Sequence, residues 1–530
     1  MAELRAMAAA IEAEEAGFRA GGGPDGQARQ RKLGRLPVRE RLDLLLDPGT
    51  AFFEIGLWAA WQMYAEWGEV PAAGLIAGIG TISGQSWVVA ANDATVKAGA
   101  MFPQSVKKLI RVQKLAHRLR LPLIYLVDSA GVFLPLQDEI FPDEDDFGRI
   151  FRNNSVLSAE GIPQFAAVMG NCIAGGAYLP VLCDKLLMTD GSQLCLAGAA
   201  LVKAAVGQVV DPAELGGAAM HAAVSGTVDF HEKDDAACLA RLRTLVGLLP
   251  PRSTTVAREV RPPRRDPDDL YGLVPADGRG EYEIRDVLDC IIDAESFVEF
   301  RPEYGKTLVT GYARIGGCPA GIVANARRRS TDSKGEVQIG GVLYGDAAEK
   351  AARFVDDCEQ TRVPLVFLQD VQGFMVGKQA EQSGIIRSGA KLVRSMSTAT
   401  VPKFTVIIGS SYGAGHYAMC GRAYDPALIL AWPNARYAVM GGSQAAETLL
   451  SLRLRDAERA GKKLSESEIA SLRESIRETY QDQTDIRYAA ARGWVDAIIR
   501  PHETRTWLAA ALSVIRPSDL VRQRCVERDV

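Results

Sequence analysis

The stretch GIPQFAAVMGNCIAGGAY, residues 161–178, joins an apolar run to a turn of small residues. Residues 400–417 repeat this pattern as TVPKFTVIIGSSYGAGHY. A short apolar run that begins near proline and ends in glycine predicts a buried strand followed by a tight turn. Because the same pattern occurs twice in one chain, we expect a duplicated fold.

Further matched segments extend the repeat in both directions. They are LPLIYLVDSAG (121–131) with VPLVFLQDVQG (363–373), RLDLLLDPGTAFFEI near Asp47 with VLDCIIDAESFVEF near Asp293, and LAG (196–198) with VMGG (439–442). Their common order and similar spacing predict two similarly folded domains. The predicted segments are a helical extension (1–24), an N-domain (25–255), a linker rich in proline and charge (256–272), a C-domain (273–515) and a tail (516–530).

Helical patterns alternate with the apolar runs. Residues 105–120 and 345–361 each have a helical pattern and each precede a strand that starts at proline. This alternation predicts an α/β fold with largely parallel strand pairing. Residues 1–23 form an amphipathic helix pattern that ends in glycines, and the charged stretch 451–481 predicts a helix at the surface or at a subunit contact.

The composition excludes several classes of protein. A net charge of -4 over 530 residues gives no case for nucleic acid binding by the whole chain. No apolar run reaches the roughly 18 residues that a membrane span needs. The nine Cys are scattered without metal-ligand spacing. We therefore expect a cytoplasmic protein that binds no nucleic acid, membrane or metal.

The two glycine turns, residues 174–178 and 413–417, are candidate binding sites for a developing oxyanion. A strand that turns into a helix here aims free backbone N–H groups outward, and the helix dipole adds positive potential. The alternative is that the small residues only permit close packing. Two occurrences at equivalent repeat positions favour two oxyanion holes, and hence a reaction with two oxyanions.

Other catalytic machinery is missing from the sequence. It contains no GxxxxGK[ST] loop for ATP, no GxSxG elbow and no HExxH motif. Of the five His, His416 alone lies in a glycine turn, and the remaining His are expected to be structural or exposed.

Several segments resemble the β subunits of biotin-dependent acyl-CoA carboxylases, which carry the carboxyltransferase activity. In the first half these are DSAGVFLPLQDEIFPDEDDFGRIFRNN (128–154), MGNCIAGGAY (169–178) and LAGAALVKAAVG (196–207). In the second half they are GGVLYGDAAEKAARFV (340–355), PLVFLQDVQGFMVGKQAEQSGIIRSGAKLV (364–393), SYGAGHYAMCGRAYDP (411–426) and AWPNARYAVMGGSQAAETL (431–449). The motifs FLPLQDEIFPD, GFMVG and YGAGHYAMCGRAYDP resemble the 3-methylcrotonyl-CoA carboxylase type most.

The resemblance implies two tandem crotonase-like (ββα-spiral) domains, with acyl-CoA on the N-domain and biotin on the C-domain. It implies a homo-oligomer, usually a hexamer, whose active site lies between the N-domain of one subunit and the C-domain of another. It also implies an α subunit that contains biotin carboxylase and carries the biotin. Carboxyl transfer from carboxybiotin to the enolate of an acyl-CoA then needs no side-chain base.

Site residues follow from the resemblance where the motifs match. The implied catalytic residues are Gly175 and Gly176 for the thioester enolate and Ala414 and Gly415 for the ureido oxygen of biotin. The implied acyl-CoA neighbours are Ala130, Gly131, Ala199 and Ala200, and the implied biotin neighbours are Phe374, Gly413 and Tyr417.

Two departures from the methylcrotonyl pattern leave the acyl specificity open. Ala199 and Ala200 stand where that type often has Pro-Pro, and Ala326 stands where it often has Asn. The run Arg327–Arg329 either neutralises phosphates of coenzyme A or forms a solvated loop. Specificity for propionyl-, acetyl- or geranyl-CoA remains an alternative, as does a decarboxylase subunit of the glutaconyl-CoA type, which uses the same enolates. A non-catalytic scaffold would have disrupted glycine turns, and both turns are intact.

Overall fold

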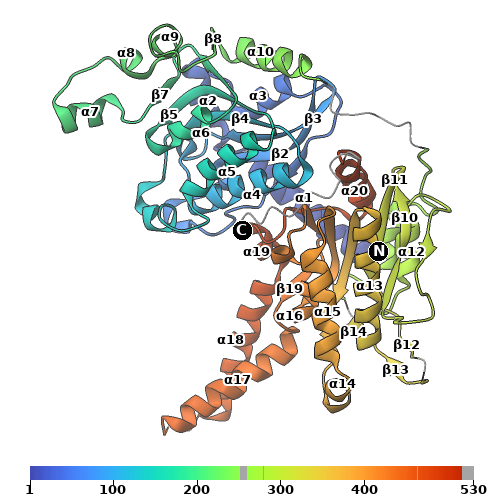
Figure 1. Cartoon of the computed structure of the whole chain (residues 1–530). Helices are drawn as coiled ribbons and strands as arrows, with labels where there is room; N and C mark the ends of the chain where they lie inside the picture. The colour runs from blue at the N-terminus through green and yellow to red at the C-terminus, as the bar shows by residue number, and fades with distance from the viewer. Residues whose placement is uncertain (251–258, 279, 333, 462–463, 516–530) are drawn as a thin grey trace. The chain divides into compact units, whose positions relative to one another are not determined.

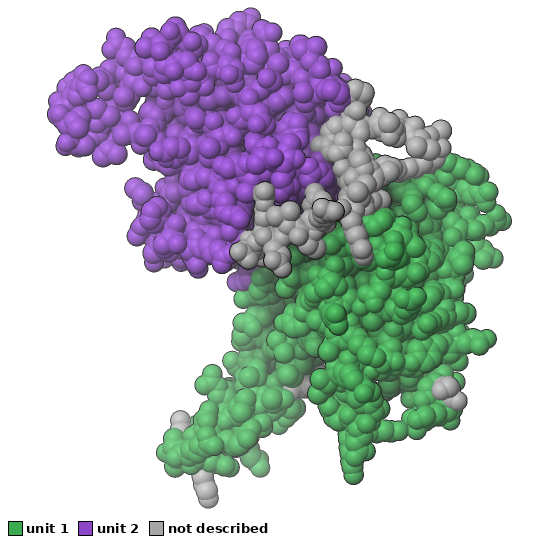
Figure 2. Space-filling model, in the orientation of Figure 1, with its two compact units in different colours: residues 1–12, 256–490, 494–530 green, residues 13–255, 491–493 purple. Residues whose placement is uncertain are grey.

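The computed structural model describes residues 1–250, 259–278, 280–332, 334–461 and 464–515. The chain forms two compact units, coloured separately in Figure 2. The N-unit comprises residues 13–255 and 491–493, and the C-unit comprises residues 1–12, 256–490 and 494–530. The end of the predicted N-domain (251–255), the start of the predicted linker (256–258) and the predicted tail (516–530) lie outside the described residues.

The N-unit is built on an eight-stranded sheet of order β1-β2-β3-β4-β5-β6-β8, with β7 beside β5. The first three strands pair antiparallel and the others pair parallel. The strands are β1 Phe53–Ile55, β2 Leu75–Ile82, β3 Gln85–Asn92, β4 Leu123–Ser129, β5 Gln164–Ile173, β6 Lys185–Thr189, β7 Gln193–Cys195 and β8 Phe230–Glu232.

The C-unit repeats this topology strand for strand. Its eight-stranded sheet has the order β20-β18-β17-β15-β11-β10-β9, with β19 beside β17. The strands are β9 Val298–Glu299, β10 Leu308–Ile315, β11 Cys318–Asn325, β15 Leu365–Val371, β17 Lys403–Tyr412, β18 Leu428–Ala431, β19 Arg436–Ala438 and β20 Ala497–Ile498. Two small pairs are added, β12 Ser330–Thr331 with β13 Val337–Gln338 and β14 Val342–Leu343 with β16 Gly373–Phe374. The predicted duplication of an α/β fold is therefore confirmed.

Helices flank both sheets (Figure 1). Those up to the end of the N-unit sheet are α1 Ala2–Arg19, α2 Gly23–Lys32, α3 Val38–Leu45, α4 Pro103–Leu119, α5 Phe147–Ala159, α6 Tyr178–Val181, α7 Ala199–Val206, α8 Pro212–Gly216, α9 Ala218–Met220 and α10 Asp235–Gly247. The later ones are α11 Leu270–Leu273, α12 Ile284–Asp289, α13 Gly345–Thr361, α14 Lys378–Gln382, α15 Ile385–Thr398, α16 Gly413–Ala418, α17 Gly442–Arg459, α18 Glu466–Thr484, α19 Ile486–Ala491 and α20 Thr504–Ser513. In the part of the chain that the structure describes, no helix has the length and apolar character needed to cross a bilayer.

Two buried lysines mark the duplication inside the cores. Lys108 of α4 donates from Nζ to the carbonyl oxygen of Ala72 at 3.0 Å, and Lys350 of α13 donates to that of Leu308 at 2.9 Å. Desolvation lowers the pKa of Lys108 to about 7 and that of Lys350 to about 8. Each lysine thus ties its helix, α4 or α13, to the antiparallel part of the sheet in the same unit.

The charged stretch 451–481 forms parts of two helices rather than one. Helices α17 and α18 lie side by side and project from the rest of the C-unit (Figure 1). Helix α18 has a capping box at its N-terminus, in which Ser465 Oγ accepts from the Glu468 N–H and the Glu468 carboxylate accepts from the Ser465 N–H. Gly461 before it has a left-handed φ of 71°. These two signals end one helix and begin the next.

Candidate active site

The first glycine turn follows the end of the central strand β5. Ala174–Ala177 form a single 3₁₀ turn that leads into α6. Ala174 has a φ of 64°, which is left-handed backbone that non-glycine residues rarely adopt. Such a conformation is typical of strained functional turns, and it redirects the chain so that Gly175 is exposed and Gly176 is half-buried.

The second glycine turn follows β17 at the equivalent place. Gly413 begins α16 with a φ of 55°, close to that of Ala174. A Cβ atom on Gly413 would lie 2.8 Å from the carbonyl oxygen of Val439, so the position requires glycine. Because the first N–H groups of a helix have no intrahelical partner, both turns can offer backbone donors to an anion.

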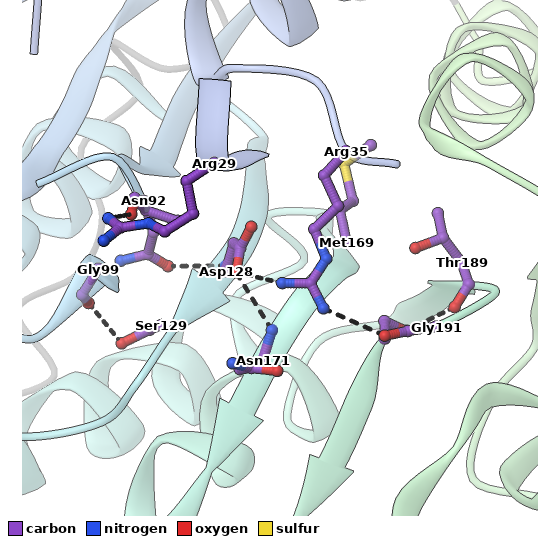
Figure 3. A network of polar contacts seen from close by, with 12 residues as sticks. Arg29, Arg35, Asn92, Gly99, Asp128, Ser129, Met169, Asn171, Thr189 and Gly191 are labelled. Atoms are coloured by element: carbon purple, nitrogen blue, oxygen red, sulfur yellow. Dashed lines mark hydrogen bonds and ion pairs between the residues drawn. The ribbon is translucent and has the colours of Figure 1, made fainter. Parts of the chain in front are cut away.

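A buried carboxylate holds the strand that carries the first turn (Figure 3). Asp128, at the end of β4, accepts on Oδ1 from the backbone N–H of Asn171 on β5 at 3.2 Å. A Cβ on Gly170 would lie 1.9 Å from this oxygen, so the carboxylate occupies the place of a side chain. Arg35 and Arg41 contact the carboxylate at 3.4 and 3.3 Å. Burial raises the pKa of Asp128, and the two guanidinium groups oppose that shift.

The C-unit repeats the arrangement with Asp370 at the end of β15. Its Oδ1 accepts from the backbone N–H of Ser410 on β17 at 2.8 Å. Arg327 lies 3.2 Å away as counterion, and the hydroxyl of Tyr282 donates to the second oxygen at 2.9 Å. Burial raises the pKa of Asp370, with Arg327 acting against it. In both units the strand register shifts beside this aspartate, which directs the following strand toward its turn.

Both aspartates lie inside the repeated motifs 121–131 and 363–373, but the sequence alone assigns them no role. The only sign of a role in the sequence is that an aspartate occupies the same position in both motifs. Its partners could not be identified from sequence, because Arg41 comes from α3 in one unit and Arg327 follows β11 in the other.

A cavity of about 40 Å³ lies next to the first turn. Gly176 and Gly131 line it together with mainly apolar side chains. The lining also includes Phe147, Cys172 and Asn92. Gly131 has a φ of 92° and would place a Cβ 3.3 Å from the carbonyl oxygen of Ile173. The predicted acyl-side residues Gly131 and Gly176 are thus brought together.

The other predicted acyl-side residues, Ala130, Ala199 and Ala200, are not among the residues that line this cavity. The backbone N–H of Ala130 donates to the carbonyl oxygen of Ala98 at 3.1 Å. Ala199 and Ala200 begin helix α7, which contains no buried residue. Strand β7 just before it pairs with β5 so that Cys195 lies opposite Ile173, beside the start of the turn.

The predicted biotin-side residues divide into a buried and an exposed group. Phe374 is partly buried, and its ring lies against Gly389 of α15, where a Cβ would be 3.2 Å from the ring. Tyr417 in α16 keeps 49% of its surface exposed. Ala414 is exposed and Gly415 is buried. The second turn therefore presents Ala414 and Tyr417 to solvent.

The arginine run 327–329 does not act as one basic patch. Arg327 is buried and paired with Asp370, and it also donates to the carbonyl oxygen of Gly278 at 2.6 Å. Arg329 is exposed and lies 2.9 Å from Glu281. Arg327 therefore neither lies in a solvated loop nor is available to neutralise phosphates of coenzyme A, because it is buried and paired with Asp370 inside the C-unit.

Comparisons with known proteins agree with this architecture. Residues 29–524 match the carboxyl transferase domain family. The chain is 45% identical to the biotin-dependent 3-methylcrotonyl-coenzyme A carboxylase beta1 subunit of Mycobacterium tuberculosis, over 97% of this chain and 94% of that one. It is 42% identical to the mitochondrial methylcrotonoyl-CoA carboxylase beta chain of Arabidopsis thaliana, over 93% and 83%.

A solved structure supports the same conclusion. The beta subunit of P. aeruginosa geranyl-CoA carboxylase superposes with a TM-score of 0.86 at 34% identity, covering 98% of this chain and 93% of that one. The duplicated sheets, the paired glycine turns and these relatives agree with the resemblance found in the sequence. The chain belongs to the carboxyl transferase domain family.

Proposed function

We propose that this chain is the carboxyltransferase component of a biotin-dependent acyl-CoA carboxylase. The observation that carries the proposal is the pair of equivalent turns, each with left-handed backbone at its first residue, Ala174 in one and Gly413 in the other. Carboxyl transfer passes through two oxyanions, one on the acyl thioester and one on biotin. Two backbone donor sites match that need, and a site with one oxyanion would not require the duplication.

The N-unit turn is the proposed acyl-CoA site. Backbone N–H groups of Gly175 and Gly176 would donate to the thioester oxygen as it gains charge. The cavity that Gly131 and Gly176 line would receive the acyl chain, and family resemblance alone adds Ala130, Ala199 and Ala200 to the proposed acyl side. The mainly apolar walls of this cavity suit an acyl chain, and the preference for a short, branched acyl group of the 3-methylcrotonyl kind rests on the family resemblance.

The C-unit turn is the proposed biotin site, and its residues fit a flat, largely apolar ring with one polar edge. Tyr417 and Val439 are 49% and 77% exposed near the donors of the turn, which gives an apolar surface beside polar N–H groups. When bound there, carboxybiotin supplies the carboxyl group. The N–H groups of Ala414 and Gly415 would hold the ureido oxygen, while Gly413 keeps the turn open and Phe374 supports it from behind.

A partner must supply what the chain lacks. The sequence has no ATP-binding loop, so we propose an α subunit with biotin carboxylase activity and an attached biotin. We also propose a homo-oligomer, a hexamer by family resemblance, in which the two kinds of site come from different subunits.

The proposal is tested with the chain and its biotin-carrying partner purified together. Carboxylation of 3-methylcrotonyl-, propionyl-, acetyl- and geranyl-CoA is measured with ATP and bicarbonate. We expect kcat/KM to be highest for 3-methylcrotonyl-CoA, and we expect no product when the chain is assayed alone. A complex that carboxylates none of the four would overturn the proposal, and a higher kcat/KM for acetyl- or propionyl-CoA would overturn the substrate assignment.

A further inference from the structure

His416 directly follows Gly415 in the second turn and is only 5% exposed. Its ring lies in a continuous chain of hydrogen bonds that joins three strands. Nδ1 lies 2.8 Å from Ser411 Oγ on β17, and Nε2 lies 2.5 Å from the hydroxyl of Tyr437 on β19. Ser411 in turn bonds Gln369 of β15 at 2.6 Å, and Gln369 bonds the carbonyl oxygen of Met419 at 2.6 Å.

The directions of the hydrogen bonds between Met419 and His416 follow from the Met419 end. A carbonyl oxygen only accepts, so the amide nitrogen of Gln369 faces it and the amide oxygen faces Ser411. The single hydroxyl hydrogen of Ser411 is then donated to Gln369. The oxygen of Ser411 can therefore only accept from His416, which places a hydrogen on Nδ1.

The other ring nitrogen faces donors. The Tyr437 hydroxyl and the backbone N–H of Arg422, at 3.3 Å, both lie against Nε2. A hydrogen on Nε2 would confront the fixed Arg422 N–H, so the neutral Nδ1–H form fits the surroundings. Burial lowers the pKa of His416 from 6.5 to about 4, in the same direction.

The ring of His416 fits only because residue 421 is glycine. A Cβ on Gly421 would lie 2.1 Å from Nε2 and 2.4 Å from Cδ2 of His416. In the N-unit turn the residue at the equivalent position is Ala177, which has no polar side chain. The chain of hydrogen bonds is therefore an addition to the C-unit turn and not a general requirement of the fold.

We propose that His416, as the neutral Nδ1–H tautomer, is a positioning residue that fixes the donors of the second turn through Ser411 and Tyr437. This inference rests on the proposed biotin site. His416 touches no reacting atom in it. Its ring anchors the residue after Gly415 to two strands at once, so the N–H groups of Ala414 and Gly415 keep one orientation. Preorganised donors of this kind stabilise charge without reorganisation during the reaction.

Two substitutions of similar shape separate the contributions of the two hydrogen bonds that the His416 ring makes. The amide of Asn can replace Nδ1, so His416→Asn keeps the bond to Ser411 and loses the bond to Tyr437. The amide of Gln can replace Nε2, so His416→Gln keeps Tyr437 and loses Ser411. His416→Asn should then match Tyr437→Phe, and His416→Gln should match Ser411→Ala. Combining the two members of either pair should add nothing further.

The readout is decarboxylation of the carboxylated acyl-CoA by the full chain, stimulated by free biotin. We expect each variant to lower kcat/KM for biotin about tenfold or more, below the 10²–10³ of a lost donor, because the donor is misplaced and not removed. KM for the acyl-CoA should stay unchanged. Tyr312→Phe is the matched control, since its hydroxyl bonds Asp357 elsewhere in the C-unit, and it should behave as wild type.

Gly421→Ala supplies a test that leaves His416 in place. It should lower kcat/KM for biotin in the wild-type background by displacing the ring, and it should have little further effect when combined with His416→Ala. Folded variants with unchanged biotin kinetics would overturn the positioning role, as would equal losses for acyl-CoA and biotin. Failure of the wild-type chain to act on any carboxylated acyl-CoA would instead overturn the proposed function.

Discussion

Gly176 and Gly415 occupy equivalent positions in the two turns, yet a Cβ atom would meet different surroundings at each. At Gly176 no atom lies within 4 Å of that position. At Gly415 the Cβ would lie 2.6 Å from Cγ2 of Val371 and 3.1 Å from Cα of Gly373. The first turn faces open space on this side, whereas the second is packed against the end of β15. The same substitution should therefore have different consequences in the two units.

Gly176→Val should abolish most activity without unfolding the protein. The added side chain enters the space beside the turn, where the thioester oxygen would approach its donors. We expect kcat to fall by at least about 10²-fold, the scale of one lost oxyanion donor. Circular dichroism and thermal unfolding should match wild type. Gly17→Val in α1, which also has no atom within 4 Å, is the control and should retain activity. Near-normal kcat in folded Gly176→Val would contradict the acyl-side assignment.

Gly415→Val should act first on stability. The side chain would overlap Val371 and the backbone of Gly373, and overpacking of this kind costs about 1–3 kcal/mol of unfolding free energy. Urea unfolding of Gly415→Ala should show a smaller loss, and Val371→Ala in the Gly415→Ala background should recover part of it. Equal unfolding midpoints for Gly415→Val and wild type would show that the turn is not packed as described.

Phe147 should limit the length of the acyl chain. It lines the cavity beside Gly176, and its ring would lie 3.8 Å from a Cβ on Gly175. Phe147→Leu enlarges the cavity, so the ratio of kcat/KM for geranyl-CoA to that for 3-methylcrotonyl-CoA should rise about tenfold, the low end of what small changes in a hydrophobic pocket achieve. Phe230→Leu, which packs on a core cluster of the same unit, should leave the ratio unchanged.

The free energy of unfolding should fall as the pH drops below neutrality, because His416 is buried in its neutral form. The pKa of His416 is lowered from 6.5 to about 4 by burial, so the unfolded chain binds a proton in this window and the folded chain does not. The stabilising contribution is complete above 6.5 and is lost as pH falls toward 4. The titratable groups around the imidazole ring are Tyr437 and Tyr417, and the nearest charged side chain is Arg422, whose guanidinium pairs with Asp496.

Urea unfolding at about pH 7.5 and about pH 5 measures this contribution. Wild type should lose more unfolding free energy between the two pH values than His416→Asn, with a ceiling of about 3 kcal/mol for the full shift. An identical loss in both proteins would contradict a neutral, buried His416.

The sequence predicted those parts of the fold that depend on local pattern. Helices α4 and α13 and strands β5 and β17 lie where periodicity placed them, because each has a clear apolar face or run. The break between α17 and α18 was missed although Ser465 and Glu468 form a recognisable capping box. The charge of residues 451–481 continues across the break, so composition alone does not mark it.

The support of the two turns could not be predicted in the same way. Asp128 depends on Arg41, which precedes it by 87 residues, and Asp370 depends on Tyr282, which precedes it by 88. Nothing local in the sequence pairs these residues. The role of His416 likewise depends on Tyr437 and Gln369, which come from different strands. The two turns are predictable from the repeated sequence pattern, whereas the groups that hold them are not.

The central claim, two donor turns that serve one carboxyl transfer, is tested most directly by the chain alone. The measurement is the rate at which it decarboxylates the carboxylated product of 3-methylcrotonyl-CoA, with and without free biotin, for wild type and Gly176→Val. We expect free biotin to accelerate the wild-type reaction and saturating biotin to leave Gly176→Val at least about 10²-fold slower. A wild-type rate independent of biotin, or a folded Gly176→Val with an undiminished rate, would contradict the account.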